Sequence, residues 1–391
     1  MAKTMQASSM MSLLCFLCAL GLMKYSAVAH NVSIVAVAHF NIQNISHGMP
    51  FIHTQRSSLP WTTYCGQPSY YNQEILESIL SKYNASKPHA LAYMIRDLSP
   101  TIIHDYRQVT YPLLTTCVAI SKPAAQVFIL KSNFYIDPAY ELILALPNVT
   151  WTHIEELRPP GSMYPCRNRG NPSDDLSVAV KTTQKYHKTR IPVLKKHGFK
   201  RLDRVLFFSE AQDASVPTIQ VPIPNSGDQG HCAKLHWILQ WMYTHTTTTW
   251  IIVADDDTAL DTSALQLDIQ AGPVIIGERY RYGSYDYITG GGGMLLNRHA
   301  TARIISECHC QDAHTYDDMW LGRCATELRI PMHHHTGFHQ ARPQDYHPLR
   351  LDTEPCAISF HKTMEFSKAD WVYWMERDDP QKHRKKCKGS R

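Results

Sequence analysis

Three consecutive aspartates, Asp255 to Asp257, directly follow the apolar run Trp250 to Ala254. A short apolar run that ends in turn-forming acids is typical of a buried strand whose carboxyl end delivers carboxylates to a sheet edge. In open α/β sheets, ligands bind at that edge. Clustered carboxylates repel each other unless a cation lies among them, and hard divalent cations prefer oxygen ligands. The triplet therefore indicates either a divalent-cation site that faces substrate phosphates or a solvated acidic turn.

The chain as a whole has an ordinary globular composition. Its 391 residues leave room for about two domains, and 44% of them are hydrophobic, with a mean hydropathy of −0.30. The net charge of +5 is modest. The basic tail over residues 381–391 is typical of a solvated chain end, so we expect no nucleic-acid partner.

The N-terminus has the pattern of a secretory signal. The apolar stretch from Met10 to Met23 precedes the A-x-A pattern at Ala27 to Ala29, which predicts a signal peptide over residues 1–29. This stretch is shorter than the roughly 20 residues that span a bilayer. We therefore expect membrane attachment only if the segment stays uncleaved. Four N-x-S/T sequons agree with secretory entry, at Asn31, Asn44, Asn84 and Asn148.

Nine cysteines follow the predicted cleavage point. In an oxidising lumen they are disulfide candidates, with one left over. Cys308-His309-Cys310 has no second C-x-x-C and no suitably spaced histidine pair, so zinc binding is only a weak alternative.

Residues rich in helix and strand breakers divide the chain. We expect an N-terminal α/β domain of unknown role over residues 30–165, a linker over 166–175 and a second α/β domain over 176–380. In the first domain, residues 32–37 and 126–130 are predicted strands, and residues 71–83 have the spacing of an amphipathic helix.

The second domain alternates strand and helix patterns. Its expected strands cover residues 176–180, 204–208, 250–254 and 274–276, and a helix carries Leu235, Ile238, Leu239 and Met242. This alternation predicts an α/β fold with three layers and a mostly parallel sheet.

Seven blocks of the second domain, taken in order, resemble the fringe-type β-1,3-glycosyltransferases. Within that family the likeness is closest to the branch that adds glucose to O-linked fucose on thrombospondin type 1 repeats. The blocks are VAVKTTQKYHKTRIPVLKK from Val178, VPTIQVPIPNSGDQGHCAK from Val216, IIVADDDTAL from Ile251, VIIGERYRYGSYDYITGGGGM from Val274, YDDMWLGRC from Tyr316, GFHQARPQDY from Gly337 and ISFHK from Ile358. The resemblance implies a GT-A fold, a Rossmann-like three-layer catalytic domain, and the first domain could be a degenerate copy of it.

The resemblance also implies a chemistry, an inverting transfer from a uridine-diphosphate sugar with Mn²⁺, or Mg²⁺, as the cofactor. A single in-line displacement needs a base for the acceptor hydroxyl and a counter-charge for the departing diphosphate. It needs no covalent nucleophile, and the sequence has no apparent Ser-His-Asp constellation. By family position, Asp257 and His339 are the metal ligands. Asp255 and Asp256 contact the ribose and donor sugar, or the metal through water.

Further donor-binding residues are expected where backbone and loop approach the nucleotide. Lys181, Thr182 and Thr183 end the first strand of the second domain, where such folds hold the nucleotide. Gly291 and Gly292, in the run from Gly290 to Gly293, permit a close approach of backbone to substrate.

The pair Asp317-Asp318 starts a predicted helix, and acids at that position are stabilised by the helix dipole. The resemblance places the general base at this pair; we favour Asp318, with Asp317 as the alternative. The triplet His333 to His335 and the lone His361 are interpreted as structural. The aromatic residues Tyr280, Tyr282, Tyr285 and Tyr287 either contact a sugar or acceptor loop, or only pack at the surface.

Taken together, the resemblance implies transfer of glucose from UDP-glucose to the 3-hydroxyl of O-linked fucose on thrombospondin type 1 repeats. The expected partners are a UDP-sugar donor and an O-fucosylated protein acceptor. A transferase that uses UDP-N-acetylglucosamine or UDP-galactose is the main alternative, and a non-catalytic glycan-binding protein is another. The resembling glucosyltransferases usually end in a KDEL-type tetrapeptide, whereas this chain ends in Lys388-Gly389-Ser390-Arg391. The endoplasmic reticulum, as the main expectation, the Golgi and secretion therefore all stay open.

Overall fold

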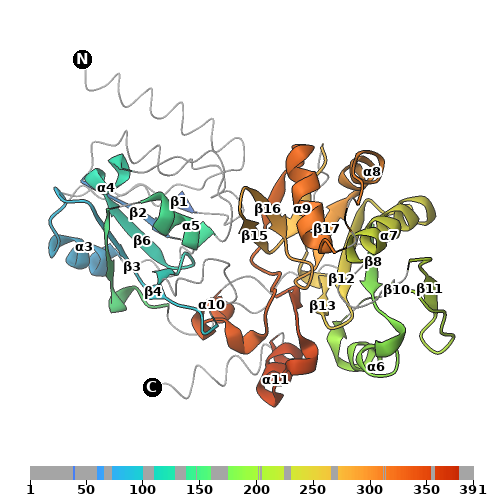
Figure 1. The fold of residues 1–391 in the computed structure, drawn as a ribbon. Coiled ribbons are helices and arrows are strands. Elements are labelled where there is room, and N and C mark those ends of the chain that lie inside the picture. The colour runs from blue at the N-terminus through green and yellow to red at the C-terminus, as the bar shows by residue number, and fades with distance from the viewer. Residues whose placement is uncertain are drawn as a thin grey trace. The chain divides into compact units, whose positions relative to one another are not determined.

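The fold is known from a computed structural model (Figure 1). It describes residues 38–39, 60–65, 73–99, 110–127, 138–146, 148–159, 175–200, 202, 205–223, 230–265, 272–310, 312, 314–353 and 357–377. The predicted signal peptide, nearly all of the predicted linker and the basic tail lie outside these residues. The chain forms two compact units, one from Met1–Arg96, Val109–Phe134 and Pro138–Pro160, the other from Asp97–Gln108, Tyr135–Asp137 and Gly161–Arg391. Each unit is described by itself.

The first unit is built on a mixed five-stranded sheet. Its strands lie in the order β1 (Ala38–His39), β2 (Trp61–Cys65), β6 (Cys117–Ser121), β3 (His89–Ala92) and β7 (Thr150–His153). A small second sheet joins β4 (Met94–Ile95) to β5 (Tyr111–Pro112). The helical segments are α3 (Gln73–Ser81), α4 (Lys122–Gln126), α5 (Pro138–Ala145) and the 3₁₀ turn η3 (Glu155–Leu157).

Predictions for the first unit are partly confirmed. The amphipathic helix expected over residues 71–83 is α3, in which Leu76, Ile79 and Leu80 are buried and Ile75 is exposed. The strand expected over residues 126–130 is wrong at its start, because Gln126 ends α4. Ser121 accepts a hydrogen bond from the Ala124 N–H and Pro123 follows within the first turn, which together start a helix there. The strand predicted over residues 32–37 lies outside the described residues.

The second unit is built on a seven-stranded sheet. Its strands lie in the order β11 (Thr218–Gln220), β10 (Val205–Ser209), β8 (Leu176–Lys181), β12 (Trp250–Asp255), β17 (Met294–Asn297), β14 (Ile275–Gly277) and β18 (Met332–His334). The first four strands pair in parallel, whereas β17 is antiparallel to both of its neighbours. The predicted α/β class with a mostly parallel sheet is thereby confirmed.

Smaller elements surround this sheet. A three-stranded sheet joins β19 (Ser359–Phe360), β13 (Ala259–Asp261) and β9 (Phe199–Lys200), and β15 (Arg279–Tyr282) forms a hairpin with β16 (Tyr285–Ile288). The α-helices are α6 (Arg190–Val193), α7 (His231–His245), α8 (Arg298–Glu307), α9 (Asp317–Glu327), α10 (Pro348–Thr353) and α11 (Lys368–Glu376). Short turns are the 3₁₀ segments η4 (Gln184–Tyr186), η6 (Thr262–Ala264), η7 (Pro343–Asp345) and η8 (Thr363–Glu365), and the π-helical η5 (Leu194–Gly198).

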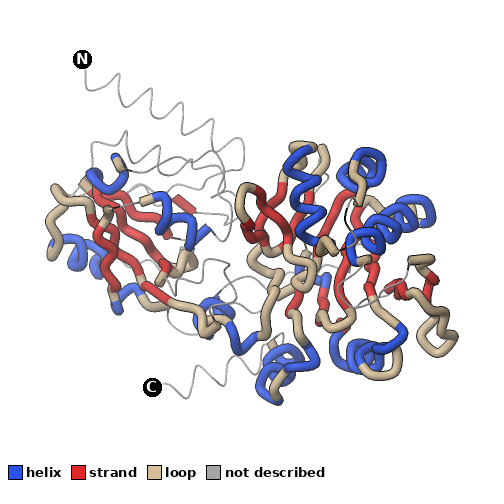
Figure 2. The backbone as a smooth tube through the Cα atoms, in the orientation of Figure 1, coloured by secondary structure: helices blue, strands red, loops and turns tan. Residues whose placement is uncertain are grey.

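Apolar layers cover both faces of the seven-stranded sheet. Alternate residues of β12 face opposite ways, so Ile251 and Val253 pack with the apolar faces of α7, α8 and α9, while Ile252 packs with Ile191 of α6 on the other side. A strand buried on both faces is apolar throughout, which is why β12 shows no polar alternation. Figure 2 shows helices on either side of the strands, and the core thus holds the strand ends in fixed positions.

Disulfides tie together the helices on one face. Cys232 at the start of α7 is bonded to Cys310, and Cys308 after α8 is bonded to Cys324 of α9. Because Cys308 and Cys310 are both in disulfides, the Cys-His-Cys run holds no zinc. In the described part of the chain, no helix combines the length and the hydropathy that a bilayer crossing needs.

Candidate active site

The acidic triplet lies at the carboxyl end of β12, where the sequence predicted it. The strand register sets Asp255 directly opposite Lys181, the last residue of β8. The Lys181 ammonium lies 2.9 Å from Asp255 Oδ1. Burial alone would lower the pKa of Lys181, but the charges of Asp255 and Asp317 outweigh burial and raise it. The parallel pairing of β8 and β12 therefore places a permanent cation beside the first aspartate.

The second and third aspartates of the triplet share a different cation. Arg190 Nη1 donates to Asp256 Oδ1 at 2.7 Å and to Asp257 Oδ2 at 3.0 Å. The guanidinium also lies over the ring of Tyr186, 3.7 Å from its centroid. Thr182 Oγ1 donates to Asp256 Oδ2 at 2.7 Å. Burial raises the pKa of Asp256 to about 6 against these opposing hydrogen bonds.

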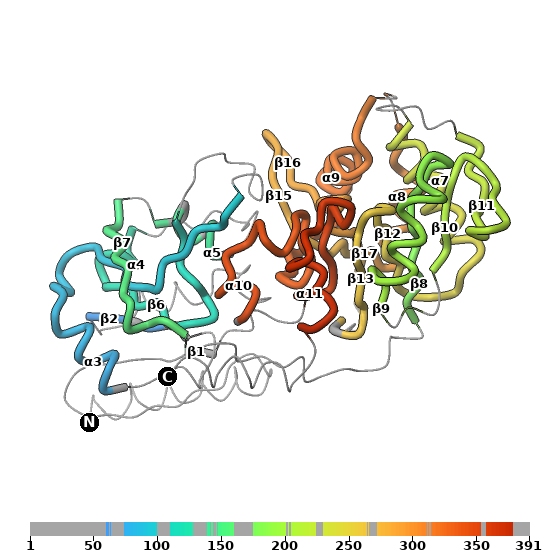
Figure 3. The backbone as a smooth tube through the Cα atoms, turned by 90° about the horizontal axis from the view of Figure 1, so that it is seen from below, coloured from blue at the N-terminus to red at the C-terminus, as the bar shows by residue number. Residues whose placement is uncertain are grey.

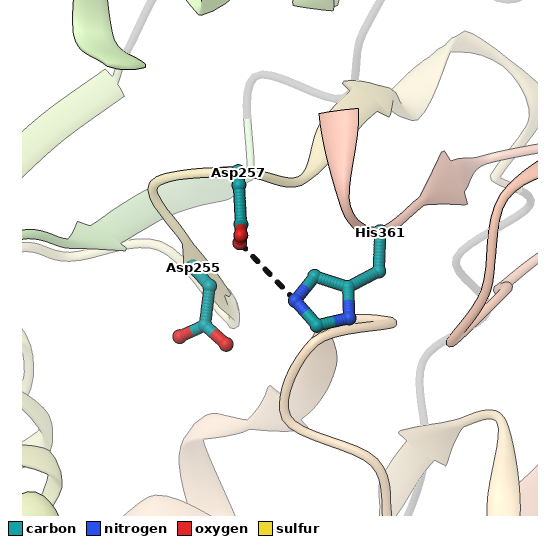
Figure 4. A group of neighbouring side chains, drawn as sticks. All are labelled: Asp255, Asp257 and His361. Atoms are coloured by element: carbon teal, nitrogen blue, oxygen red, sulfur yellow. Dashed lines mark ion pairs between the residues drawn. The ribbon is translucent and has the colours of Figure 1, made fainter. Parts of the chain in front are cut away.

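Three side chains come together as a possible metal group. The ligand atoms of Asp255, Asp257 and His361 all lie within 4.8 Å of one another, and Figure 4 shows the three side chains directed toward one shared space. His361 Nε2 lies 3.1 Å from Asp257 Oδ1. Its Nδ1 lies 3.1 Å from the main-chain oxygen of Gln340 and donates to it, which directs Nε2 toward the carboxylates. Two carboxylates and one imidazole fit a divalent metal ion.

The structure brings His361, and not the predicted His339, to the aspartates. The reason is strand pairing: β19 runs antiparallel to β13, with Phe360 opposite Ala259, so the residue after Phe360 lies beside the triplet. The His339 side chain is 2% exposed, stacks on Phe360 with ring centroids 4.2 Å apart, and has Nδ1 2.9 Å from the Ser359 carbonyl oxygen. Burial lowers the pKa of His339 to about 3.

Sequence reasoning interpreted His361 as structural and assigned His339 as the ligand, because two Phe-His dipeptides, Phe338-His339 and Phe360-His361, offered the same local signal. It also missed Arg190, which lies in the first resembling block but outside its predicted donor-binding residues. Among the other predicted residues, Thr183 caps the short turn η4 with its hydroxyl, which accepts from the Lys185 N–H at 3.4 Å.

The pair Asp317-Asp318 begins α9, as predicted, and its two carboxylates have different surroundings. Lys181 donates to the carboxylate of Asp317. Asp318 accepts from the Gly290 N–H at 3.1 Å and from the Met319 N–H at 2.7 Å. Burial and the neighbouring charge of Asp317 raise the pKa of Asp318 to about 6. Asp317 is therefore paired with a cation, whereas Asp318 accepts hydrogen bonds from two main-chain N–H groups.

The predicted glycine turn lies between the metal group and the base pair. A Cβ on Gly291 would lie 2.3 Å from Nδ1 of His361, so only glycine lets the turn pass this close to the imidazole. The Gly292 N–H donates to the side-chain oxygen of Gln340 at 2.7 Å. Gly290 contacts Asp318 and Gly291 contacts His361, so one turn sets the distance between the Asp318 carboxylate and the His361 imidazole.

One further constellation was not apparent from the sequence. His187 Nε2 lies 2.8 Å from Ser209 Oγ, and its Nδ1 lies 3.1 Å from Asp213 Oδ2. This is the order of a Ser-His-Asp triad, but the Ser209 side chain is fully buried, so no substrate reaches its hydroxyl. The three residues hold the loop after β8 against the end of β10. The remaining histidine run, with His333 and His334 in β18, is not part of the metal group.

Comparisons with known proteins identify the family of this chain. A sequence model of the fringe-like family matches residues 172–390. A mouse (Mus musculus) protein named beta-1,3-glucosyltransferase is 32% identical over 80% of this chain and 71% of its own length. The human (Homo sapiens) protein of the same name is 32% identical over 85% of this chain and 74% of its own length.

Among solved structures, a glycosyltransferase involved in glycosylation of the major capsid of PBCV-1 has a TM-score of 0.31 and 16% identity, over 51% of this chain and 99% of its own. A likeness this distant does not identify a family. The family is shown by the match over residues 172–390, most of the second unit, and by the two relatives, which are similar over most of both lengths. This chain is therefore a glycosyltransferase and belongs to the fringe-like family.

Proposed function

We propose that the protein transfers glucose from UDP-glucose to the 3-hydroxyl of O-linked fucose on thrombospondin type 1 repeats, with inversion and with Mn²⁺. One observation carries the proposal. A cation-binding group, Asp255, Asp257 and His361, and a carboxylate with a raised pKa, Asp318, are held together by one glycine turn and one lysine. An inverting transfer needs these two functions at one place and no covalent nucleophile.

The charged residues of the site have different roles in donor binding. When bound, a divalent ion would supply the positive charge that balances the departing diphosphate. Asp255, Asp257 and His361 would hold that ion. The Arg190 guanidinium, which forms ion pairs with Asp256 and Asp257, adds a further positive charge to the site. Lys181 keeps Asp317 and Asp255 oriented. This arrangement supports assigning donor binding to the ends of β8 and β12.

Asp318 is the residue that we propose as general base. Its carboxylate takes the proton of the acceptor hydroxyl as that oxygen attacks the anomeric carbon of the sugar. A base is most effective when its pKa is near the working pH, and burial has raised that of Asp318 to about 6. Asp317 is the weaker candidate, because Lys181 donates directly to its carboxylate and so occupies the oxygen that would accept the proton.

The choice of glucose rests on the relatives, both of which are named beta-1,3-glucosyltransferases. The choice of O-linked fucose on thrombospondin repeats rests on the sequence blocks that resemble that branch of the family. Residence in the secretory pathway, with the endoplasmic reticulum as the main expectation, rests on the predicted signal peptide and the sequons. Transfer of N-acetylglucosamine or galactose would use the same acidic residues and the same base.

The test is a transfer assay with Mn²⁺ on protein secreted from cultured cells. It offers a fucosylated thrombospondin repeat and, separately, a fucosylated EGF repeat, each with UDP-glucose, UDP-N-acetylglucosamine and UDP-galactose. Glucose added only to the thrombospondin repeat supports the proposal. Transfer of another sugar, or transfer to the EGF repeat, would change the proposed donor or acceptor and leave the proposed mechanism unchanged. UDP-sugar binding without any transfer would favour a glycan-binding protein.

A further inference from the structure

The hairpin of β15 and β16 carries a stripe of tyrosines beside the base helix. Tyr280 lies opposite Tyr287, and Tyr282 lies opposite Tyr285. Because side chains two residues apart share one face of a strand, the two pairs form one stripe on one face of the hairpin. The inner pair, Tyr280 and Tyr287, is buried, at 2% and 3% exposed. The stripe runs from the core to the hairpin tip.

The outer pair has no comparable cover. Tyr282 is 55% exposed, and Tyr285 is half-buried. Their ring centroids are 6.2 Å apart in an edge-to-face contact, so each ring orients the other. The inner pair explains how the hairpin is anchored, but neither the fold nor the chemistry described above uses the outer pair.

Helix α9 fixes the hairpin against the base. A Cβ on Gly322 would lie 2.3 Å from the Cβ of Tyr287 and 2.4 Å from the main-chain oxygen of Asp286, so helix and strand pack backbone to backbone. Asp318 lies four residues before Gly322 and therefore on the same face of the helix. Figures 1 and 3 both place the hairpin alongside α9. The hairpin and the helix that carries the proposed base therefore pack directly against each other.

The tip of the stripe is in electrostatic range of the base. Burial, Tyr282 and the Asp318 carboxylate all raise the pKa of Tyr285. The acceptor hydroxyl must come within hydrogen-bond distance of Asp318 to lose its proton. The sugar ring that carries this hydroxyl therefore lies beside α9, where the nearest exposed aromatic surface of the hairpin is the outer pair.

We propose that Tyr282 and Tyr285 bind the sugar ring of the acceptor and determine acceptor specificity. The proposal rests on the proposed function and names the residues that recognise its acceptor. A pyranose has no charge to pair with, but its C–H faces are apolar and suit a flat aromatic surface. Two rings inclined at 61° present a face and an edge, which together accept one orientation of the sugar and so select the hydroxyl that meets Asp318.

The test compares Tyr282→Ala and Tyr285→Ala with Tyr282→Phe and Tyr285→Phe, which keep the rings. Two acceptors are used, methyl α-L-fucoside and the O-fucosylated thrombospondin repeat. We expect each alanine variant to raise the KM for both acceptors about fivefold, equivalent to about 1 kcal/mol, and each phenylalanine variant to change it less than about twofold. Hydrolysis of UDP-glucose without acceptor and the thermal midpoint should not change.

Val372→Ala, at a 44% exposed position of α11, is the matched control for loss of surface apolar area. An unchanged KM in both alanine variants overturns the proposal, and so does a rise confined to the whole repeat, because the pair would then contact protein and not sugar. Wild-type protein that transfers nothing contradicts the proposed function instead. Saturation-transfer NMR with methyl α-L-fucoside decides the tyrosine assignment in that case, since the method needs no turnover. Loss of fucoside binding in the alanine variants supports the assignment. Unchanged binding in these variants, or no binding to the wild type, overturns the assignment.

Discussion

Lys181 donates directly to the carboxylate of Asp317, a residue 136 positions later in the chain. The same ammonium lies 2.9 Å from Asp255 Oδ1. One lysine therefore connects the end of β12, where the candidate metal group lies, to the first turn of α9, where the proposed base lies. This connection joins the two halves of the candidate site.

Removal of the Lys181 charge should destabilise the protein. Lys181→Met leaves two carboxylates in a largely buried place without their cation, and breaking one side of a buried ion pair costs about 3–5 kcal/mol. The free energy of unfolding, from urea titration, measures this. Adding Asp317→Asn to the variant should recover part of the loss, because one of the two unpaired charges is gone. If the double variant were no more stable than Lys181→Met, the Lys181–Asp317 contact would not be the reason.

The identity of the metal-binding histidine can be decided by titration. His361→Ala should weaken Mn²⁺-dependent binding of UDP at least tenfold, because it removes a ligand from a group of three. His339→Ala should lower thermal stability, since a buried ring that stacks on Phe360 is lost, and should leave the affinity of the folded protein for Mn²⁺ and UDP nearly unchanged. Isothermal titration calorimetry gives both values. The reverse pattern would restore His339 as the ligand.

Because the glycine turn lies so close to the His361 imidazole, one methyl group added at Gly291 should strongly reduce the affinity for Mn²⁺. Gly291→Ala places a Cβ 2.3 Å from His361 Nδ1, so the ring must move and the Mn²⁺ affinity should fall about 10- to 100-fold. Gly272→Ala is the matched control, because no atom lies within 4 Å of its Cβ position. Equal Mn²⁺ affinity in the two variants would show that the turn does not position His361.

Loss of the proposed base should separate binding from chemistry. Asp318→Asn keeps the shape and one oxygen acceptor for the Gly290 N–H, so we expect wild-type affinity for UDP-glucose and a rate of transfer reduced about 10²- to 10⁴-fold. Asp317→Asn should reduce the rate less and stability more, since it disrupts the Lys181 contact. A normal rate in Asp318→Asn together with an inactive Asp317→Asn would exchange the two roles.

The raised pKa of Asp318 predicts an acid limit to activity. The base works only when ionised, and its pKa is about 6, so kcat/KM should fall about tenfold for each pH unit below that value and level off above it. Asp256 has a similarly raised pKa, so the profile is repeated on Asp256→Asn. The acid limb should persist in that variant. Its disappearance there would assign the limb to Asp256.

The raised pKa of Asp318 also makes the stability of the folded protein depend on pH. The folded-state pKa of Asp318 lies above the ordinary carboxyl value of 3.8, so the folded protein binds this proton more tightly than the unfolded chain. Its contribution to stability is therefore present below pH 4 and is lost as the pH rises through about 6. At neutral pH the ionised carboxylate lowers stability, and Asp318→Asn should be at least as stable as the wild type. A clear loss of stability in that variant would contradict this linkage.

The sequence by itself determined the local features of the protein. The uninterrupted apolar run of β12 fixed a strand that ends at the aspartates, and the acidic pair before an amphipathic stretch fixed the start of α9. These features depend on residues adjacent in the chain, where hydrophobic pattern and helix capping act. The α/β class followed from the alternation of such elements.

Only the tertiary structure decided which distant residues meet. The antiparallel pairing of β19 with β13 selected His361 over His339, although both follow a phenylalanine. The parallel register of β8 with β12 set Lys181 against Asp255, and the packing of α9 brought Asp317 to the same ammonium. Long-range strand register and helix packing are set by how apolar faces fit across the core, so the spacing of residues along one segment does not contain them.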